Sequence, residues 1–124
     1  MRAEDVYERI VKGGDNSYFQ VSVQSADEYA KGHIPGAINI PFRNIADAAS
    51  LSSLPRGKKI VLSCEDGHRS MAAALFLSQL GYDTNVVSMG LSRWNKTGSN
   101  LASPYPGSAG YPVSTVESAK PERY

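Results

Sequence analysis

Short apolar runs, separated by polar or glycine-containing turns, predict a series of strands along the chain. The clearest lies within residues 58–64, because Ile60, Val61 and Leu62 are consecutive and apolar, as in a parallel strand covered on both faces. Residues 18–23 are rich in aromatic and β-branched side chains and predict a second strand. Shorter strands are predicted over residues 37–40 and 84–89.

Helix signals fall between the predicted strands. Residues 71–80 are rich in alanine and leucine, which favour a helix, and Gly81 suits its C-terminal end. Ser25 and Glu28 have the spacing of a capping box ahead of a helix over residues 26–31. Further short helices are predicted over residues 3–12, 44–54 and 91–96. Strands that alternate with helices predict an α/β fold, with a central, mostly parallel sheet flanked by helices.

The C-terminal part of the chain has a different composition. Residues 98–124 are dense in glycine, serine and proline, and their few apolar residues do not recur at helical or strand spacing. We therefore predict one domain over residues 1–97 and an irregular tail over residues 98–124. Tyr105, Tyr111 and Val113 are the tail side chains expected to lie against the domain.

Length and charge narrow the class of protein. A chain of 124 residues suits one domain with a real core. The formal net charge is +1 and the basic residues are scattered, so neither nucleic acid nor a membrane surface is an expected partner. No apolar run approaches the ~18 residues that span a bilayer. Residues 1–10 carry charges and no apolar signal core, which predicts a cytoplasmic protein.

The chain has one cysteine, Cys64, and two histidines, His33 and His68, that are far apart in sequence. Disulfides within the chain are excluded, and a structural metal site is not expected. Cys64 comes directly after the best predicted strand, at the end where ligands bind in open α/β sheets. The amides of the following loop and the positive end of the next helix favour a thiolate there.

The residues that follow Cys64 each suggest a role. Gly67 permits a positive φ, and the Ser70 hydroxyl is expected to cap the helix. Arg69 offers several donors and is expected either to bind substrate or to brace the loop. His68 is expected either to contact substrate or to be simply exposed. Two carboxylates, Glu65 and Asp66, are expected to oppose the thiolate and to repel anionic sulfur donors.

Two segments of the chain together carry a family resemblance. The order Cys64-x-x-Gly67-x-Arg69-Ser70 resembles the active-site loop of rhodanese-like sulfurtransferases. Residues 28–41, which read EYAKGHIPGAINIP, resemble the second signature of that family. The likeness extends over about residues 3–96 with the segments in the right order. It implies a three-layer rhodanese-like fold around a parallel sheet.

The resemblance also implies a chemistry. Cys64 would attack a small sulfur donor such as thiosulfate, or a protein persulfide, and carry the sulfur as a persulfide. It would then pass the sulfur to a thiol or to cyanide, without a metal or an organic cofactor. The substrate-binding residues implied by the loop are Glu65, Asp66, Gly67, His68, Arg69 and Ser70.

The chain departs from the family pattern in two places. Ser22 and Gln24 stand where the family has Asp-x-Arg, and Met89 precedes Gly90 where Gly-Gly is common. A non-catalytic or weakly catalytic binding or sulfur-relay module is therefore one alternative. A cysteine-dependent phosphatase or arsenate reductase is another, although related phosphatases place five residues between cysteine and arginine, whereas residues 65–68 make four.

Overall fold

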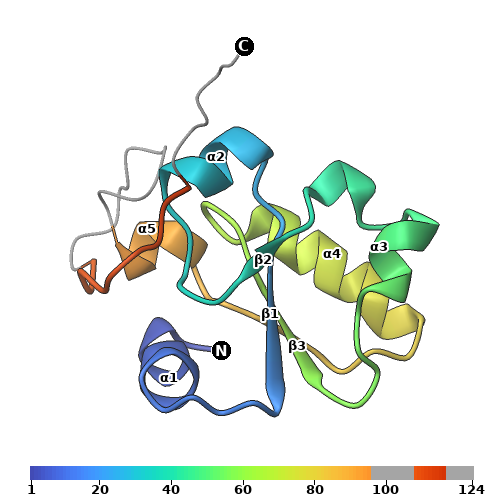
Figure 1. Ribbon diagram of the computed structural model, residues 1–124, viewed down its shortest axis with the longest axis horizontal. Helices are drawn as coiled ribbons and strands as arrows, with labels where there is room; N and C mark the ends of the chain where they lie inside the picture. The colour runs from blue at the N-terminus through green and yellow to red at the C-terminus, as the bar shows by residue number, and fades with distance from the viewer. Residues whose placement is uncertain (96–107, 117–124) are drawn as a thin grey trace.

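The computed structural model describes residues 1–95 and 108–116, and the chain forms an α/β fold around one parallel sheet. The four strands lie in the order β2-β1-β3-β4, and every neighbouring pair is parallel. They are β1 (Tyr18–Ser22), β2 (Ile38–Asn39), β3 (Lys59–Ser63) and β4 (Thr84–Val86). The sheet is seen nearly edge-on in Figure 1, with β2 toward the viewer.

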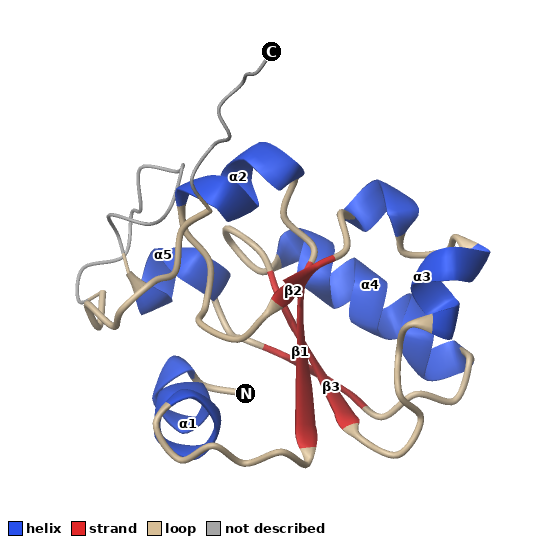
Figure 2. Cartoon of the chain, in the orientation of Figure 1, coloured by secondary structure: helices blue, strands red, loops and turns tan. Residues whose placement is uncertain are grey.

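Helices cover both faces of this sheet, and Figure 2 shows them to the left and to the right of the strands. The helices are α1 (Ala3–Val6), η1 (Tyr7–Val11), α2 (Ala26–Lys31), η2 (Phe42–Asn44), α3 (Ala48–Ser52), α4 (His68–Gln79) and α5 (Gly90–Trp94). The predicted three-layer arrangement is therefore confirmed. Each parallel crossover carries a helix or an extended loop, as this topology requires.

Side-chain alternation along β3 divides the core into two clusters. Ile60, Leu62 and Cys64 pack on the α4 side of the sheet, with Leu77 of α4. Val61 points to the other face, into the cluster that holds α1 and α5. The consecutive apolar residues of β3 are thus buried on both faces, as the sequence predicts.

Several predicted elements differ from the structure. The helix expected over residues 44–54 is replaced by η2 and α3, because the Asn44 amide binds the Asp47 carboxylate at 2.9 Å and holds a turn there. The N-terminal helix changes at Tyr7 to a wider turn, in which the Lys12 N–H bonds the Tyr7 carbonyl. Strand β4 ends early, because Met89 adopts a φ of 63° that turns the chain into α5.

Residues 108–116 run back over the domain. Ser114 forms an antiparallel bridge with His33, and the Trp94 indole N–H donates to the Pro112 carbonyl at 2.9 Å. Tyr111 and Val113 pack against the α1–α5 cluster, as expected, whereas the expectation for Tyr105 falls outside the described residues. The boundary between residues 97 and 98 falls there too and stays a prediction.

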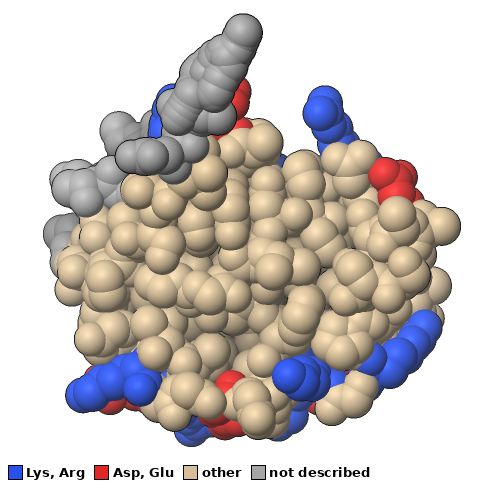
Figure 3. Space-filling view, in the orientation of Figure 1, with Lys and Arg blue, Asp and Glu red and all other residues tan. Residues whose placement is uncertain are grey.

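The face of the molecule seen in Figure 3 is uncharged over most of its middle, and charged side chains gather toward its upper and lower margins. Strand β2 forms this edge of the sheet, and Ile38 is 39% exposed there. Since β2 pairs through only two residues, the edge is too short to recruit another strand efficiently. Within the described ranges, no helix is long and apolar enough to span a membrane. A cytoplasmic location stays a prediction.

Candidate functional site

Cys64 lies at the carboxyl end of β3, one of the two central strands of the sheet. Its side chain points to the α4 face and is fully buried in the cluster that contains Ile60 and Leu62. Main-chain bonds to both neighbouring strands hold β3 in place. The sulfur therefore has a well-defined position at the end of the sheet where α4 begins.

Main-chain amides point at this sulfur. The Gly67 nitrogen lies 3.1 Å from Sγ and the Ser70 nitrogen 3.4 Å from it. The Cys64 thiol in turn donates to the Ser70 hydroxyl oxygen, 3.4 Å from Sγ. Because the two amides belong to the first turn of the twelve-residue helix α4 and to its N-cap, the helix dipole reinforces them. Together they favour a negatively charged sulfur.

Helix α4 begins at His68, earlier than the sequence predicted, and its N-cap is Gly67. Gly67 has a φ of 96°, which confirms the predicted left-handed turn. The expectation that the Ser70 hydroxyl caps the helix is wrong, because Ser70 lies within the first turn and its hydroxyl donates to the Gly67 carbonyl at 3.1 Å. The early start brings the positive end of α4 directly against the sulfur.

Helix α5 supports the loop from the opposite side. The Leu91 N–H donates to the Cys64 carbonyl at 2.9 Å, and the Ser92 N–H donates to the Glu65 carbonyl at 3.0 Å. Gly90 packs so closely that a Cβ there would lie 2.1 Å from the Cys64 carbonyl oxygen. The glycine of the Met89-Gly90 pair is thus required by the site, while Met89 takes a strained positive φ.

Asp66 and His68 form a pair at the outer side of the loop. Asp66 Oδ1 accepts from the His68 backbone N–H at 3.0 Å, and its Oδ2 lies 3.0 Å from His68 Nδ1. The backbone N–H of His68 is the largest cause that holds the pKa of Asp66 below its ordinary value of 3.8. Asp66 Oδ1 lies 3.9 Å from the Cys64 sulfur. The His68 side chain is 88% exposed, and its predicted contact with substrate stays a prediction.

Glu65 turns into the protein rather than toward solvent, and the residue is 1% exposed. The Gln24 amide donates to Glu65 Oε2 at 2.7 Å and to the Gly32 carbonyl at 3.0 Å. The Ser22 hydroxyl donates to Gln24 Oε1 at 2.6 Å. Ser22 and Gln24, which replace the Asp-x-Arg of the family pattern, are therefore part of a buried hydrogen-bond network below the loop. The sequence showed that the Asp-x-Arg of the family is replaced, but it did not show that Gln24 binds Glu65.

Arg69 points toward α2. Its guanidinium contacts Glu28 Oε1 at 2.9 Å and Oε2 at 3.1 Å. Glu28 also accepts from the Ser25 backbone N–H at 2.8 Å, which completes the predicted capping box. Burial raises the pKa of Glu28, but the Ser25 backbone N–H and Arg69 outweigh it and leave the pKa below its ordinary value of 4.5. Of its two predicted roles, Arg69 thus has the contacts of a brace between the loop helix and α2.

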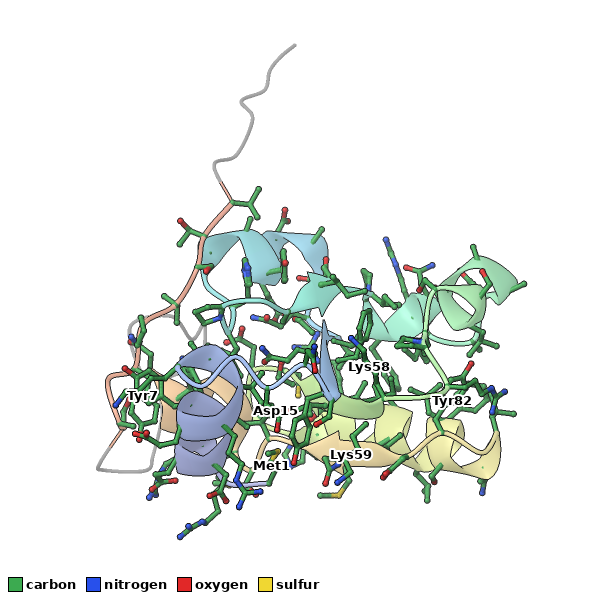
Figure 4. All side chains as sticks on the ribbon, turned by 60° about the horizontal axis from the view of Figure 1, so that its bottom comes forward. Met1, Tyr7, Asp15, Lys58, Lys59 and Tyr82 are labelled. Carbon is green, nitrogen blue, oxygen red and sulfur yellow. The ribbon has the colours of Figure 1, made fainter. Side chains whose placement is uncertain are left out.

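Two cavities flank the loop. One of about 400 Å³ lies on the Asp66–His68 side and is lined by the chain's three methionines, one of which, Met1, is labelled in Figure 4. Another of about 470 Å³ includes Arg69. Among residues 1–95 and 108–116, no three His, Cys, Asp or Glu side chains are grouped closely enough to hold a metal ion.

The family comparison agrees with this geometry. The sequence model of the rhodanese-like domain matches residues 2–97. The chain belongs to the rhodanese-like domain family. Its fold is shared with a rhodanese-related protein from Thermoplasma volcanium, at 32% identity and a TM-score of 0.72, over 92% of this chain and 95% of that one.

Relatives of this rhodanese-like chain include proteins named as sulfurtransferases. The putative sulfurtransferase YtwF of Bacillus subtilis is 30% identical over 64% of this chain and 76% of its own length. The thiosulfate:glutathione sulfurtransferase of Saccharomyces cerevisiae is 31% identical over 69% of this chain and 70% of its own length. At the level of the family, the chain is a rhodanese-type sulfurtransferase homologue.

Proposed function

We propose that this protein transfers sulfane sulfur from a donor to a thiophilic acceptor through a persulfide on Cys64. The observation that carries the proposal is the pair of backbone N–H groups of Gly67 and Ser70 that point at Sγ. Such donors stabilise both a thiolate and the negative charge of a persulfide. Glu65, Asp66, His68 and Arg69 would support this site through their backbone or side chains.

The first half-reaction loads the sulfur. The Cys64 thiolate attacks the outer sulfur of thiosulfate, a new S–S bond forms, and the bond to the sulfonate sulfur breaks. The electron pair of the broken bond leaves with sulfite. A persulfide donor reacts in the same way and leaves as its thiolate.

The second half-reaction unloads it. A thiolate or cyanide attacks the outer sulfur of the Cys64 persulfide, and the S–S bond breaks. Its electron pair returns to Sγ as a thiolate, which the Gly67 and Ser70 amides stabilise. The acceptor leaves as a persulfide or as thiocyanate, and neither half-reaction needs a metal or an organic cofactor.

Local charge favours donors that are not strongly anionic. The Asp66 carboxylate lies 3.9 Å from Sγ, while the positive charge of Arg69 is paired with Glu28. A dianion such as thiosulfate therefore meets a nearby negative charge without a matching cation from Arg69. We expect weak turnover of thiosulfate and faster loading from a neutral or protein-borne persulfide.

A binding or sulfur-relay module is the second candidate function. It is favoured by the burial of Cys64, which is 0% exposed. Such a protein would load sulfur only when a partner opens the loop. Its thiosulfate turnover would be negligible, although partner binding would survive Cys64→Ser.

Intact-protein mass spectrometry after incubation with thiosulfate or a persulfide donor tests the proposal. The expected result is a gain of one sulfur atom that cyanide removes and that Cys64→Ser lacks. The matched control is Ser63→Ala, which truncates the neighbouring buried side chain at the end of β3 and should still load. Absence of any gain with every donor would overturn the proposal, and turnover of an aryl phosphate or arsenate instead would identify a different reaction.

A further inference from the structure

The sulfur of Cys64 is enclosed by its own loop, residues 64–67, which we call the cysteine loop. Cys64 is 0% exposed, and it lines neither of the two cavities beside the loop. A sulfur donor or acceptor can therefore reach Sγ only after the loop has moved. The elements that hold the cysteine loop in place thus control access to the sulfur.

A segment late in the chain lies against two of these elements. We call residues 108–116 the strap, and Figure 1 shows it running from beside α5 to the end of α2. At its α5 end, the Ala109 N–H donates to the Arg93 carbonyl at 3.0 Å, and the Tyr111 N–H donates to the Trp94 carbonyl at 3.1 Å. The strap is thus fixed to the helix whose own N–H groups bind two carbonyls of the cysteine loop.

The other end of the strap is bound to α2 and to the turn that follows it. The Ser114 N–H donates to the His33 carbonyl at 2.9 Å, and the Ser114 carbonyl accepts from the His33 N–H at 3.0 Å. The Val116 N–H donates to the Ala30 carbonyl, within α2, at 2.9 Å. The strap therefore ties α2 to α5 through main-chain hydrogen bonds at both of its ends.

Helix α2 holds the cysteine loop as well. Its Glu28 pairs with Arg69, in the first turn of α4. The two α2-side partners of the strap flank Gly32, whose carbonyl accepts from the Gln24 amide at 3.0 Å. The same amide donates to Glu65, the residue after the cysteine, at 2.7 Å. Both helices that the strap ties together are thus bonded to the cysteine loop or to its supports.

The α2 end is the weaker attachment of the strap. The α5 end adds the bond from the Trp94 indole and the packing of Tyr111 on Tyr7 and Trp94. The α2 end is held by the three main-chain bonds described above, and Thr115 and Val116 are exposed there. Because segments with little buried surface open first under native conditions, the α2 end should detach while the α5 end stays bound.

We propose that the strap is a clamp that controls access to Cys64. While both ends are bound, α2 and α5 are held together and the cysteine loop stays closed over Sγ. Release of the α2 end lets the two helices separate, so that the loop opens and Sγ meets sulfur donors and acceptors. The clamp goes beyond the proposed function, because it decides when the sulfur reacts rather than what the sulfur does.

Alkylation of Cys64 by iodoacetamide measures how often the sulfur is exposed. The thiolate displaces iodide and forms an S–C bond, and intact-protein mass spectrometry follows the rate. Cys64 is the chain's single cysteine, so Cys64→Ser gives the background from other side chains. Iodoacetamide is uncharged, so the Asp66 carboxylate near Sγ does not repel it.

Two variants weaken the α2 end of the strap. Ser114→Pro removes the N–H that donates to the His33 carbonyl, and Val116→Pro removes the N–H that donates to the Ala30 carbonyl. Each should speed alkylation of Cys64 by about fivefold, which corresponds to about 1 kcal/mol, the ordinary contribution of one hydrogen bond. Loading of sulfur from a persulfide donor should speed up by the same factor.

Two matched controls separate the clamp from general effects. Thr115→Pro makes the same substitution between the two test positions, at an exposed residue whose N–H donates to neither α2 nor α5. Tyr82→Phe removes the hydroxyl that donates to the Leu51 carbonyl at 3.2 Å, and Figure 4 shows Tyr82 on the opposite side of the domain from Tyr7. Both controls should be alkylated at the wild-type rate, although Tyr82→Phe lowers the global stability.

Urea separates opening of the clamp from global unfolding. Opening exposes little surface, so alkylation at low urea should rise only slightly with its concentration, whereas global unfolding would make it rise steeply. A steep rise in the wild type, or equal alkylation rates in wild type, Thr115→Pro and both test variants, would overturn the clamp. If Ser114→Pro does not fold, Val116→Pro decides the comparison. Faster alkylation without sulfur loading from any donor would instead overturn the proposed function and leave the clamp standing.

Discussion

The sulfur of Cys64 is contacted mainly by main-chain donors, and two charged residues of its loop, Glu65 and Arg69, are bound to residues outside the loop. The Gly67 and Ser70 amides point at Sγ, while Glu65 is bound by Gln24 and Arg69 by Glu28. Backbone donors keep their geometry as long as the turn persists, so the site depends on the residues that hold the turn. Those residues lie partly outside the loop motif.

Gln24 is one such residue, and its removal should affect the sulfur chemistry. Gln24→Ala deletes the donor to Glu65 and leaves a buried carboxyl with one fewer hydrogen bond, at a cost of about 1–3 kcal/mol. Because Glu65 directly follows Cys64, we expect the rate of persulfide formation to fall as well. Urea denaturation measures the first effect, and timed mass spectrometry the second.

Gln20→Ala is the matched control for this prediction. It truncates the same residue type, which lies within β1 rather than just after it, and Gln20 donates to the Pro35 carbonyl instead of to a residue of the Cys64 loop. It should lower stability while leaving the rate of persulfide formation near the wild-type value. If persulfide formation slowed equally in both variants, Gln24 would contribute to stability in general and not to the sulfur chemistry.

At the scale of elements, α4 is joined to α2 through Arg69 and Glu28. The sequence predicted α2 well, because the capping box of Ser25 and Glu28 is a local signal. It placed the start of α4 too late. Gly67 caps the helix because its N–H binds the Cys64 sulfur and because the α5 backbone holds the loop in place. Contacts between elements decided that boundary.

The α2–α4 link makes stability depend on pH. The pKa of Glu28 is lowered in the folded protein, so the stability that its carboxylate contributes is fully present above its ordinary pKa of 4.5. That stability is lost as the pH falls below 4.5 and passes through the lower pKa that Glu28 has in the folded protein. Glu28→Gln should therefore be less stable than wild type at pH 7, by about 1 kcal/mol, and the difference should shrink below pH 4.5.

Urea denaturation at several pH values measures this difference. Glu8→Gln is the control, because Glu8 pairs with Lys12 at 3.7 Å and both side chains are more than half exposed. It should change stability little at any pH. If the difference in unfolding free energy between Glu28→Gln and wild type stayed constant from pH 7 to pH 3, ionisation of Glu28 would not be its cause.

At the scale of the whole molecule, residues 108–116 close the α1–α5 face of the domain. Tyr111 stacks on Tyr7 with ring centroids 4.3 Å apart, and its ring meets Trp94 edge-on at 5.0 Å. Trp94 belongs to α5, the helix that supports the Cys64 and Glu65 carbonyls. A segment far along the chain thus stabilises the back of the site.

Tyr111→Ala should therefore destabilise the domain by about 2 kcal/mol, through lost burial and lost aromatic contacts. Trp94 is the chain's single tryptophan, so its fluorescence reports the unfolding transition in urea. Val116→Ala, at a site that is 48% exposed, is the control and should cost little. Equal stability of the two variants would show that the segment contributes nothing through Tyr111.

By itself, the sequence determined the features that depend on neighbouring residues. These are the alternation of strands and helices, the capping box at Ser25, the buried strand β3, and the position of Cys64 at its end. Local backbone preferences and apolar periodicity are short-range effects, and a single chain displays them directly.

Only the tertiary structure decided which side chains meet. Glu65 and Gln24 are 41 residues apart, as are Arg69 and Glu28, and no local pattern couples them. The close approach of Gly90 to the Cys64 carbonyl and the packing of Tyr111 on Tyr7 arise in the same way. Such contacts depend on how strands and helices pack in three dimensions, because long-range partners are chosen by burial and shape rather than by sequence spacing.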